Sequence, residues 1–239
     1  MFENKVVVFD VSSSIALFRK PYTTTSSVSY MIPPPTTVAG LIAAVLGFDN
    51  GASEKGYFAK YWNKLKGCQI ALRILNPVRW FRTAINLQKT KDPQKSPRIQ
   101  VKHQFLKEPK YRIYFKGPIS EKLEEHLKNQ RYVFTPYLGV AYALANIEYI
   151  GTFEEKDVEE QETFVHSVVP KQDAYIDFSK TPYVHKDIFP FEMDAERTIT
   201  KTVNVFYTTT PKLSIYITNG LDIGVKEIGN ERIVWFDEW

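Results

Sequence analysis

Residues 33–47 read Pro-Pro-Pro-Thr-Thr-Val-Ala-Gly-Leu-Ile-Ala-Ala-Val-Leu-Gly, and this stretch decides how the first half of the chain folds. The Ala and Leu residues after the prolines predict a helix that a threonine caps at its start and Gly47 ends. Nearly every face of this helix is apolar, which is typical of a buried helix. We therefore expect it to pack against a sheet whose first strand is residues 5–11.

The segments that follow extend this start into a recognisable order. Residues 69–75, 78–87 and 99–115 have the composition of extended segments, an amphipathic helix capped by Ser120 comes next, and residues 141–153 are again β-rich. Strand, helix, strand, strand, helix, strand is the split βαβ order of ferredoxin-like and RRM-like folds, whose sheet face commonly binds RNA. We predict an α+β fold, with such a domain over residues 1–155 and a small β-rich C-terminal region over residues 156–239.

Composition excludes several classes of protein. The 239 residues suffice for a sizeable core, and the single cysteine, Cys68, rules out an internal disulfide and a multi-cysteine zinc site. The N-terminus carries Glu3 and Asp10 where a signal peptide has a basic region. The most apolar run, residues 38–48, has 11 residues, whereas a membrane span needs about 20. We expect a cytoplasmic protein that makes no membrane contact.

The formal net charge of +4 conceals a strong asymmetry along the chain. Residues 79–116 hold eleven Lys or Arg against two acids, a net charge of +9, while the rest carries 20 bases and 25 acids, a net charge of −5. Such a segment predicts contact with a polyanion, and interleaved aromatic residues suit single-stranded RNA. The alternative is a solvated hairpin whose lysines protect its edges. For Phe105, Tyr114 and Phe115 we favour core packing over stacking on bases.

Two short stretches carry a resemblance to a known family. Residues 18–47 begin Phe-Arg-Lys-Pro-Tyr-Thr-Thr-Thr-Ser-Ser and end in the proline-helix segment above, and residues 135–139 read Thr-Pro-Tyr-Leu-Gly. Residues 18–47 closely resemble the N-terminal signature of the CRISPR-associated family five proteins, and residues 135–139 are similar to a Leu-Gly element of that family. These RAMP-superfamily proteins are subunits of antiviral type I Cascade-like surveillance complexes. The form of the signature looks most like the type I-B branch, with type I-A as the other candidate.

The resemblance implies a ferredoxin-like RAMP domain with an inserted β-hairpin thumb, here near residues 88–107. It implies that the protein caps the 5′ handle of the crRNA and contacts the backbone subunit and the large subunit of the complex. The RNA-binding residues that we predict from the resemblance and the charge pattern are Arg19, Lys20, Tyr22, Thr23, Thr24, Ser26, Ser27, Tyr30, Lys89, Lys91, Arg98, Lys102 and His103.

Each of these residue types has a suitable chemistry for RNA. Arg and Lys can neutralise phosphates, while Ser and Thr hydroxyls can bond phosphate oxygens or the ribose 2′-OH. Tyr22 and Tyr30 can stack on bases, and burial of one of these rings against the proline turn is an equal alternative. Backbone N–H groups at the start of the helix near Thr37 suit a phosphate.

The sequence gives little support for an enzyme. Four histidines are present without metal-ligand spacing, and no phosphate-binding loop or nucleophile motif appears, so we predict no catalytic residue, no metal and no cofactor. The alternative is a metal-independent endoribonuclease that uses His103 and Lys102 with Tyr111, or Tyr22 in its place, because such chemistry needs an acid or base and a group that supports phosphate charge. The type I-C branch of the family resembles such an enzyme.

Overall fold

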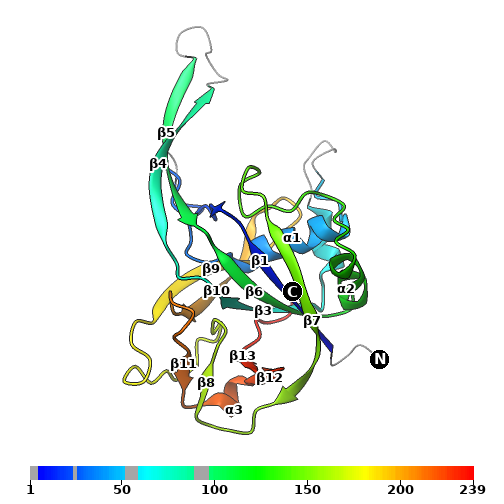
Figure 1. The fold of residues 1–239 in the computed structure, drawn as a ribbon, viewed down its shortest axis with the longest axis vertical. Helices are drawn as coiled ribbons and strands as arrows, with labels where there is room; N and C mark the ends of the chain where they lie inside the picture. The colour runs from blue at the N-terminus through cyan, green and yellow to red at the C-terminus, as the bar shows by residue number, and fades with distance from the viewer. Residues whose placement is uncertain (1–4, 24–25, 52–58, 89–96) are drawn as a thin grey trace.

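The computed structural model describes residues 5–23, 26–51, 59–88 and 97–239 as a mixed fold built mostly of strands (Figure 1). Up to Asp157 the elements are β1 (Lys5–Ser12), β2 (Ile15–Ala16), α1 (Pro35–Leu46), the 3-10 helix η1 (Lys60–Lys64), β3 (Gln69–Ile74), β4 (Trp80–Gln88), β5 (Arg98–Lys107), β6 (Lys110–Lys116), α2 (Ser120–Lys128) and β7 (Asn146–Asp157). The later elements are β8 (Thr163–Val165), β9 (His185–Met193), β10 (Ile199–Tyr207), β11 (Ile215–Ile217), α3 (Gly220–Ile223), β12 (Lys226–Ile228) and β13 (Glu231–Ile233).

A six-stranded sheet with the order β13-β12-β7-β1-β6-β3 forms the centre of the body. Strand β1 lies antiparallel between β6 and β7, and β3 is antiparallel to β6. One face of β1 carries Val7, Phe9 and Val11, which pack in the main core with Ile42 of α1 and Leu123 of α2. The two predicted helices therefore cover the same face of the sheet, and the predicted sequence of strands and helices is observed.

The opposite face of the same strands is covered by the C-terminal region. Val6, Val8 and Tyr114 are buried there against Ile228 of β12 and Trp235. The sheet face that commonly binds RNA in ferredoxin-like and RRM-like folds is covered by C-terminal side chains in this part of the sheet. The prediction that Tyr114 packs in a core is confirmed.

A buried ion network fastens the C-terminal region to this face. The Arg112 guanidinium donates to both carboxylate oxygens of Asp10, at 2.7 and 3.1 Å, and to Glu231 of β13 at 2.8 Å. Arg73 and the Tyr114 hydroxyl also contact the Glu231 carboxylate. Asp10 is 3% exposed, so a buried carboxylate is stabilised here only because a charged donor faces both of its oxygens.

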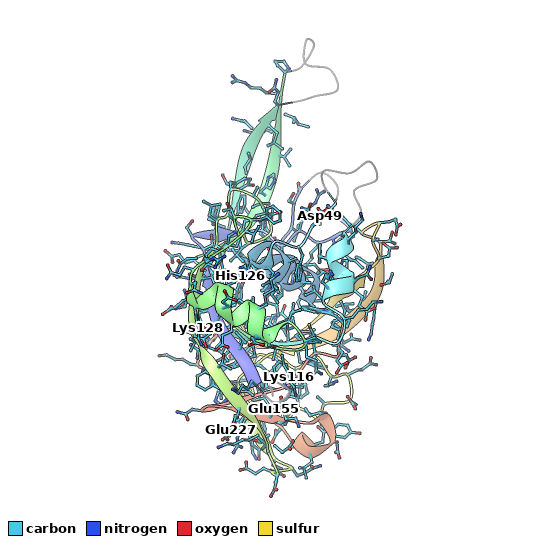
Figure 2. The ribbon with its side chains drawn as sticks, turned by 90° about the vertical axis from the view of Figure 1, so that its right-hand side faces the viewer. Asp49, Lys116, His126, Lys128, Glu155 and Glu227 are labelled. Carbon is cyan, nitrogen blue, oxygen red and sulfur yellow. The ribbon has the colours of Figure 1, made fainter. Side chains whose placement is uncertain are left out.

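A second set of contacts joins β6, β7 and the segment after β13. Lys116 Nζ lies 2.8 Å from Glu155 Oε1, and the indole of Trp235 donates to the other oxygen of Glu155 at 2.7 Å. Lys116 and Glu155 lie below α2 in Figure 2. The C-terminal region is thus held by polar as well as apolar contacts.

The ends of the helices differ from the prediction in two places. No threonine caps α1: Pro34 occupies the cap position and Pro35 the first turn, where a missing N–H costs nothing. Gly47 ends α1 with φ 72°, as predicted. Ser120 is the first residue of α2 instead of its cap, and its hydroxyl accepts a hydrogen bond from the Gly117 N–H at 3.0 Å. None of the helices in the described ranges is long and apolar enough to cross a membrane.

Strands β4 and β5 form a two-stranded arm that projects from the body (Figure 1). The register runs from Trp80 opposite Leu106 to Gln88 opposite Arg98. The predicted thumb, residues 88–107, therefore contains the returning strand of the arm. The outgoing strand begins earlier, at Trp80. Strand β2 pairs with the base of β5 and anchors the arm to the body.

The second half of the chain contains a strand pair, β9 and β10. The sequence predicts a strand over residues 198–207, which corresponds to β10, and predicts none over β9. Pro190 lies inside β9, and a proline argues against a strand because it cannot donate a ladder hydrogen bond. It is tolerated here because β9 pairs on one side only and the register shifts near its partner Thr202. The predicted domain boundary at residue 155 lies within β7, and the division of the chain there stays a prediction.

Replacing Gly139 by Ala tests how closely the turn at residues 135–139 approaches the N-terminal segment. Gly139 has φ +84°, and a Cβ there would lie 2.0 Å from the Leu17 carbonyl oxygen. Gly224 is the matched control, since it has φ +68° with nothing within 4 Å of a Cβ. We expect Gly224→Ala to cost roughly 1–2 kcal/mol and Gly139→Ala about 1–3 kcal/mol more in urea unfolding. Equal losses would contradict the packing.

Candidate nucleic-acid interface

The arm has two chemically different faces because side chains alternate along each strand. One face carries mostly polar residues, namely Arg82, Ala84, Asn86, Gln88, Arg98, Gln100, Lys102 and Gln104. The other carries the largely apolar residues Phe81, Thr83, Ile85, Leu87, Ile99, Val101, His103 and Phe105. Three described basic residues of the arm, Arg82, Arg98 and Lys102, lie on the first face, whereas Lys107 at its base follows the alternation of the second.

A short hairpin packs against the base of the arm. It consists of residues 18–23 and 26–30, called here the N-terminal hairpin, and its two sides pair through Arg19 and Ser29. The Ser27 N–H donates to the Lys102 carbonyl at 3.0 Å, and the Gln104 N–H donates to the Ser27 carbonyl at 2.9 Å. Ser27 thus continues the arm as a short third strand beside β5.

A groove of about 500 Å³ lies where the hairpin meets the arm. Its lining is Ser26, Ser27, Val28, Arg82, Thr83, Ala84, Lys102, His103 and Gln104. Four predicted site residues, two serines with Lys102 and His103, are therefore brought together. The site prediction missed Arg82 and Thr83, although Arg82 belongs to the basic segment and its position opposite Gln104 follows from the hairpin register.

The ring of His103 is fixed in the groove. Its Nδ1 lies 3.0 Å from the Val101 carbonyl, which can only accept, so Nδ1 carries the proton in neutral histidine and Nε2 is the acceptor. The ring also stacks on Phe105 at 5.6 Å and 11°, and Phe105 stacks on Phe81 at 5.6 Å. Phe105 is 2% exposed, which confirms the prediction that it is a core residue.

Arg19 and Thr23 shape the tip of the hairpin. The Arg19 guanidinium donates to the Thr23 carbonyl at 2.5 Å, and the Thr23 hydroxyl donates to the Lys20 carbonyl at 2.7 Å. Arg19 is exposed, and a second donor, its Nε, lies 3.4 Å from the Thr23 hydroxyl, so the guanidinium helps to order the turn. Tyr22, the other predicted stacking residue of the hairpin, is 71% exposed at the same tip, with Lys20 Nζ 6.0 Å from its ring centre.

Lys20 and Tyr30 take structural positions instead. Lys20 Nζ lies 3.0 Å from Asp187 of β9 and 4.9 Å from the centre of the Tyr30 ring. Tyr30 is 4% exposed and packs edge-on against Phe189, so no ring face remains for a base. Burial, with the Asp187 carboxylate adding to it, raises the pKa of Tyr30 to about 12. These two predicted RNA contacts are corrected to contacts that join the hairpin to β9.

Three predicted residues, Thr24, Lys89 and Lys91, lie outside the described residues. Arg98 is exposed at the outer end of β5, opposite Gln88, and lies apart from the groove lining. Of the described basic residues on the arm, Arg82 and Lys102 line the groove, Arg98 lies near the outer end, and Lys107 lies at the base.

The family follows from comparison with known sequences. A model described as CRISPR-associated protein (Cas_Cas5) matches residues 6–174, more than two thirds of the chain. The chain belongs to this CRISPR-associated protein family. The matched range includes the N-terminal hairpin, the arm and the turn at residues 135–139. A comparison with curated protein sequences finds no match.

Solved structures share the fold of this family member. A CRISPR protein from Archaeoglobus fulgidus has a TM-score of 0.59 at 16% identity, with 96% of this chain and 98% of that chain covered. A chain of a CRISPR RNA-guided surveillance complex has a TM-score of 0.53 at 13% identity, covering 89% and 91%. A chain of a Type III-B Cmr-beta complex bound to cognate target RNA has a TM-score of 0.50 at 14% identity, covering 87% and 86%.

The three residues of the catalytic alternative are not assembled. Lys102 and His103 line the groove, but Tyr111 is 2% exposed in the core and its hydroxyl donates to the Met31 carbonyl at 3.2 Å. Burial raises the pKa of Tyr111 far above its usual value. Within the described ranges, no group of three or more His, Cys, Asp and Glu side chains could hold a metal ion.

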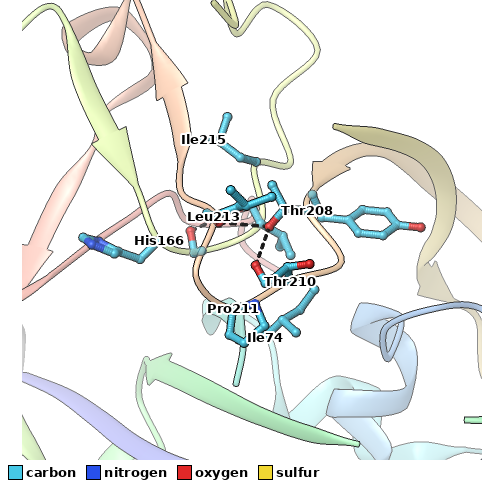
Figure 3. A pocket seen from close by; sticks show the side chains of 10 residues that line it. Ile74, His166, Thr208, Thr210, Pro211, Leu213 and Ile215 are labelled. Carbon is cyan, nitrogen blue, oxygen red and sulfur yellow. Dashed lines mark hydrogen bonds between the residues drawn. The ribbon is translucent and has the colours of Figure 1, made fainter. Parts of the chain in front are cut away.

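A second cavity, beside β11, is too small to bind a ligand (Figure 3). It has room for about 10 Å³, which at most holds one water. The Thr208 hydroxyl lies 3.2 Å from the Thr210 carbonyl and 3.0 Å from the Leu213 carbonyl. Its hydrogen-bond donor is therefore satisfied by the protein itself, and no ligand is needed. This cavity is a packing defect in the C-terminal region and adds nothing to the interface.

A double-mutant cycle on Lys20 and Asp187 tests whether this contact holds the hairpin. We expect Lys20→Ala and Asp187→Ala to be coupled by about 1 kcal/mol in urea unfolding, because the pair is mostly buried. Arg79 and Glu108 are the matched control, since the same 3.0 Å separation joins side chains that are 58% and 56% exposed. A coupling no larger than that of the control pair would show that Lys20 is not a structural residue.

Proposed function

We propose that this chain is the crRNA-binding subunit of a type I Cascade-like surveillance complex. In this proposal the groove between the N-terminal hairpin and the arm holds the 5′ handle of the crRNA, and other surfaces contact the backbone and large subunits. The observation that carries it is the groove itself, whose lining includes two cations, two serines and a histidine. The signature at residues 18–47 favours the type I-B branch, with type I-A as the other candidate.

In the same proposal, β7, β1, β6 and β3 with α1 and α2 form a ferredoxin-like domain, and the arm is its thumb. The strand order β7-β1-β6-β3 supports this, since it is what the split βαβ connection gives when all neighbours are antiparallel. We assign residues 156–239 to a C-terminal region that covers the second sheet face.

Each part of the groove has a separate role. Arg82 and Lys102 neutralise phosphates, which gives affinity that falls with salt. The serine hydroxyls bond phosphate or sugar oxygens, and Nε2 of neutral His103 accepts a hydrogen bond from a ribose 2′-OH, which DNA lacks. Tyr22 offers a ring to an unstacked base. None of these roles requires a bond to break, and we propose that the chain is not an enzyme.

Removing the two groove cations should weaken RNA binding. We expect Arg82→Ala with Lys102→Ala to lower affinity for single-stranded repeat RNA roughly tenfold to a hundredfold, and to reduce the salt slope by about 1 to 1.5, because two phosphate contacts are lost. Fluorescence anisotropy at several salt concentrations measures both. Arg131→Ala is the control, being an exposed arginine outside the groove. Unchanged binding by the double variant would sink the proposal.

His103→Phe should remove sugar discrimination while keeping the ring that stacks on Phe105. We expect the preference for RNA over DNA of the same sequence to fall roughly threefold to tenfold, because one acceptor for the 2′-OH is lost. Incubating the wild-type chain with repeat RNA and EDTA should leave the RNA intact. A defined product that His103→Phe abolishes would instead support the endoribonuclease.

A further inference from the structure

A loop between α2 and β7 exposes an unusual set of apolar side chains. Within residues 133–144, five large side chains are 46–60% exposed: Val133, Phe134, Tyr137, Tyr142 and Leu144. Exposed apolar side chains scattered singly need no explanation, but a cluster of this size on one loop marks an interaction surface.

This loop and α1 enclose a groove of about 340 Å³. One wall is the surface of α1 at Thr37, Gly40 and Ala44, where small side chains let a bound segment approach the helix closely. The other wall includes the rings of Phe134 and Tyr137. The groove is therefore mainly apolar and aromatic, and it differs in character from the polar groove at the arm.

Arg197 is the one charged residue that lines this groove among the residues described. Its guanidinium donates to the Asn50 carbonyl at 3.1 Å, which is an uncharged acceptor. Its backbone has φ +66°, a left-handed conformation that costs energy for a residue other than glycine. Tyr61 lines the same groove as Arg197. Burial raises the pKa of the Tyr61 hydroxyl, and the Arg197 charge opposes this rise.

The composition fits a protein partner better than RNA or a small molecule. Aromatic residues and arginine are the types that dominate binding energy at the centre of protein interfaces. A single cation does not form a track along a phosphate backbone. The exposed apolar surface also extends beyond the groove to Tyr142 and Leu144, which a small ligand inside it would leave uncovered.

We propose that this groove docks a segment of another subunit of the complex, which inserts an apolar side chain between α1 and the aromatic wall and pairs a carboxylate with Arg197. The proposal rests on the proposed function, because the partner is taken from the same complex. The loop is also continuous with the RNA site: the Leu17 N–H donates to the Leu138 carbonyl at 3.2 Å, and Tyr142 packs against Phe105 at the base of the arm.

The test is binding of the purified chain to each of the other subunits, one at a time, by biolayer interferometry. We expect one subunit to bind the wild-type chain and to lose at least tenfold in affinity with Phe134→Ser and with Arg197→Glu. The matched controls are Phe178→Ser, an exposed aromatic residue outside the groove, and Arg131→Glu, an exposed arginine outside it. A photo-crosslinking residue at position 137 should capture a peptide of that subunit containing Asp or Glu.

The outcomes separate this inference from the proposed function. If subunits bind and both groove variants behave like their controls, the docking site is wrong while the proposed function stands. If the wild-type chain binds RNA but no subunit, the docking site is overturned. If it binds neither RNA nor any subunit, both proposals fail. The groove variants should bind RNA like the wild-type chain, and equal losses of RNA and subunit binding would indicate a damaged fold and overturn the docking assignment.

Discussion

Two backbone hydrogen bonds between Ser27 and β5 are the contact on which the candidate site depends. They place the serine hydroxyls of the N-terminal hairpin beside Lys102 and His103, which come from a strand more than seventy residues later in the chain. The hairpin is held from two further sides, by the Leu138 carbonyl at Leu17 and by Asp187 at Lys20. Because backbone groups make the central contact, the position of Ser27 beside β5 does not depend on its side chain.

The C-terminal region determines where this site can be. It buries Val8 and Tyr114 on the sheet face that related architectures leave open for RNA, and it is fixed there by Asp10, Arg112 and Glu231. A buried network of this kind is stable only when every charge has its partner. One sheet face lies under α1 and α2 and the other is covered in this way, and the polar groove lies outside the sheet, at the base of the arm. The loop at residues 133–144 joins that surface to the apolar groove beside α1.

Local signals predicted much of the fold. The prolines and Gly47 predict the ends of α1, and alternation predicts that Phe105 and Tyr114 are buried. The strand β9 was missed because Pro190 contradicts a strand locally, and the structure tolerates it only through one-sided pairing and a shifted register. Capping by Ser120 was wrong because its hydroxyl has a closer use at the Gly117 N–H.

The sequence predicted several residues that line the candidate site, but it did not predict which side chains contact other parts of the chain instead. Charge and the N-terminal signature pointed to Ser27, Lys102 and His103, and these do meet. Lys20 and Tyr30 were assigned to RNA because their side-chain types suit it, yet their partners, Asp187 and Phe189, lie over 150 residues away in the sequence. No local pattern carries that information. The same holds for the cover of the sheet, which depends on where β12 and β13 pack.

The most direct test of the central claim is to map the RNA on the protein by photo-crosslinking. Repeat RNA carrying 4-thiouridine is bound to the chain, irradiated and digested, and the crosslinked peptides are identified by mass spectrometry. The account predicts crosslinks in peptides that contain residues 19–30, 81–85 and 98–107. Crosslinks confined to β12, β13 and the strands beneath them, with none in the N-terminal hairpin or the arm, would contradict it.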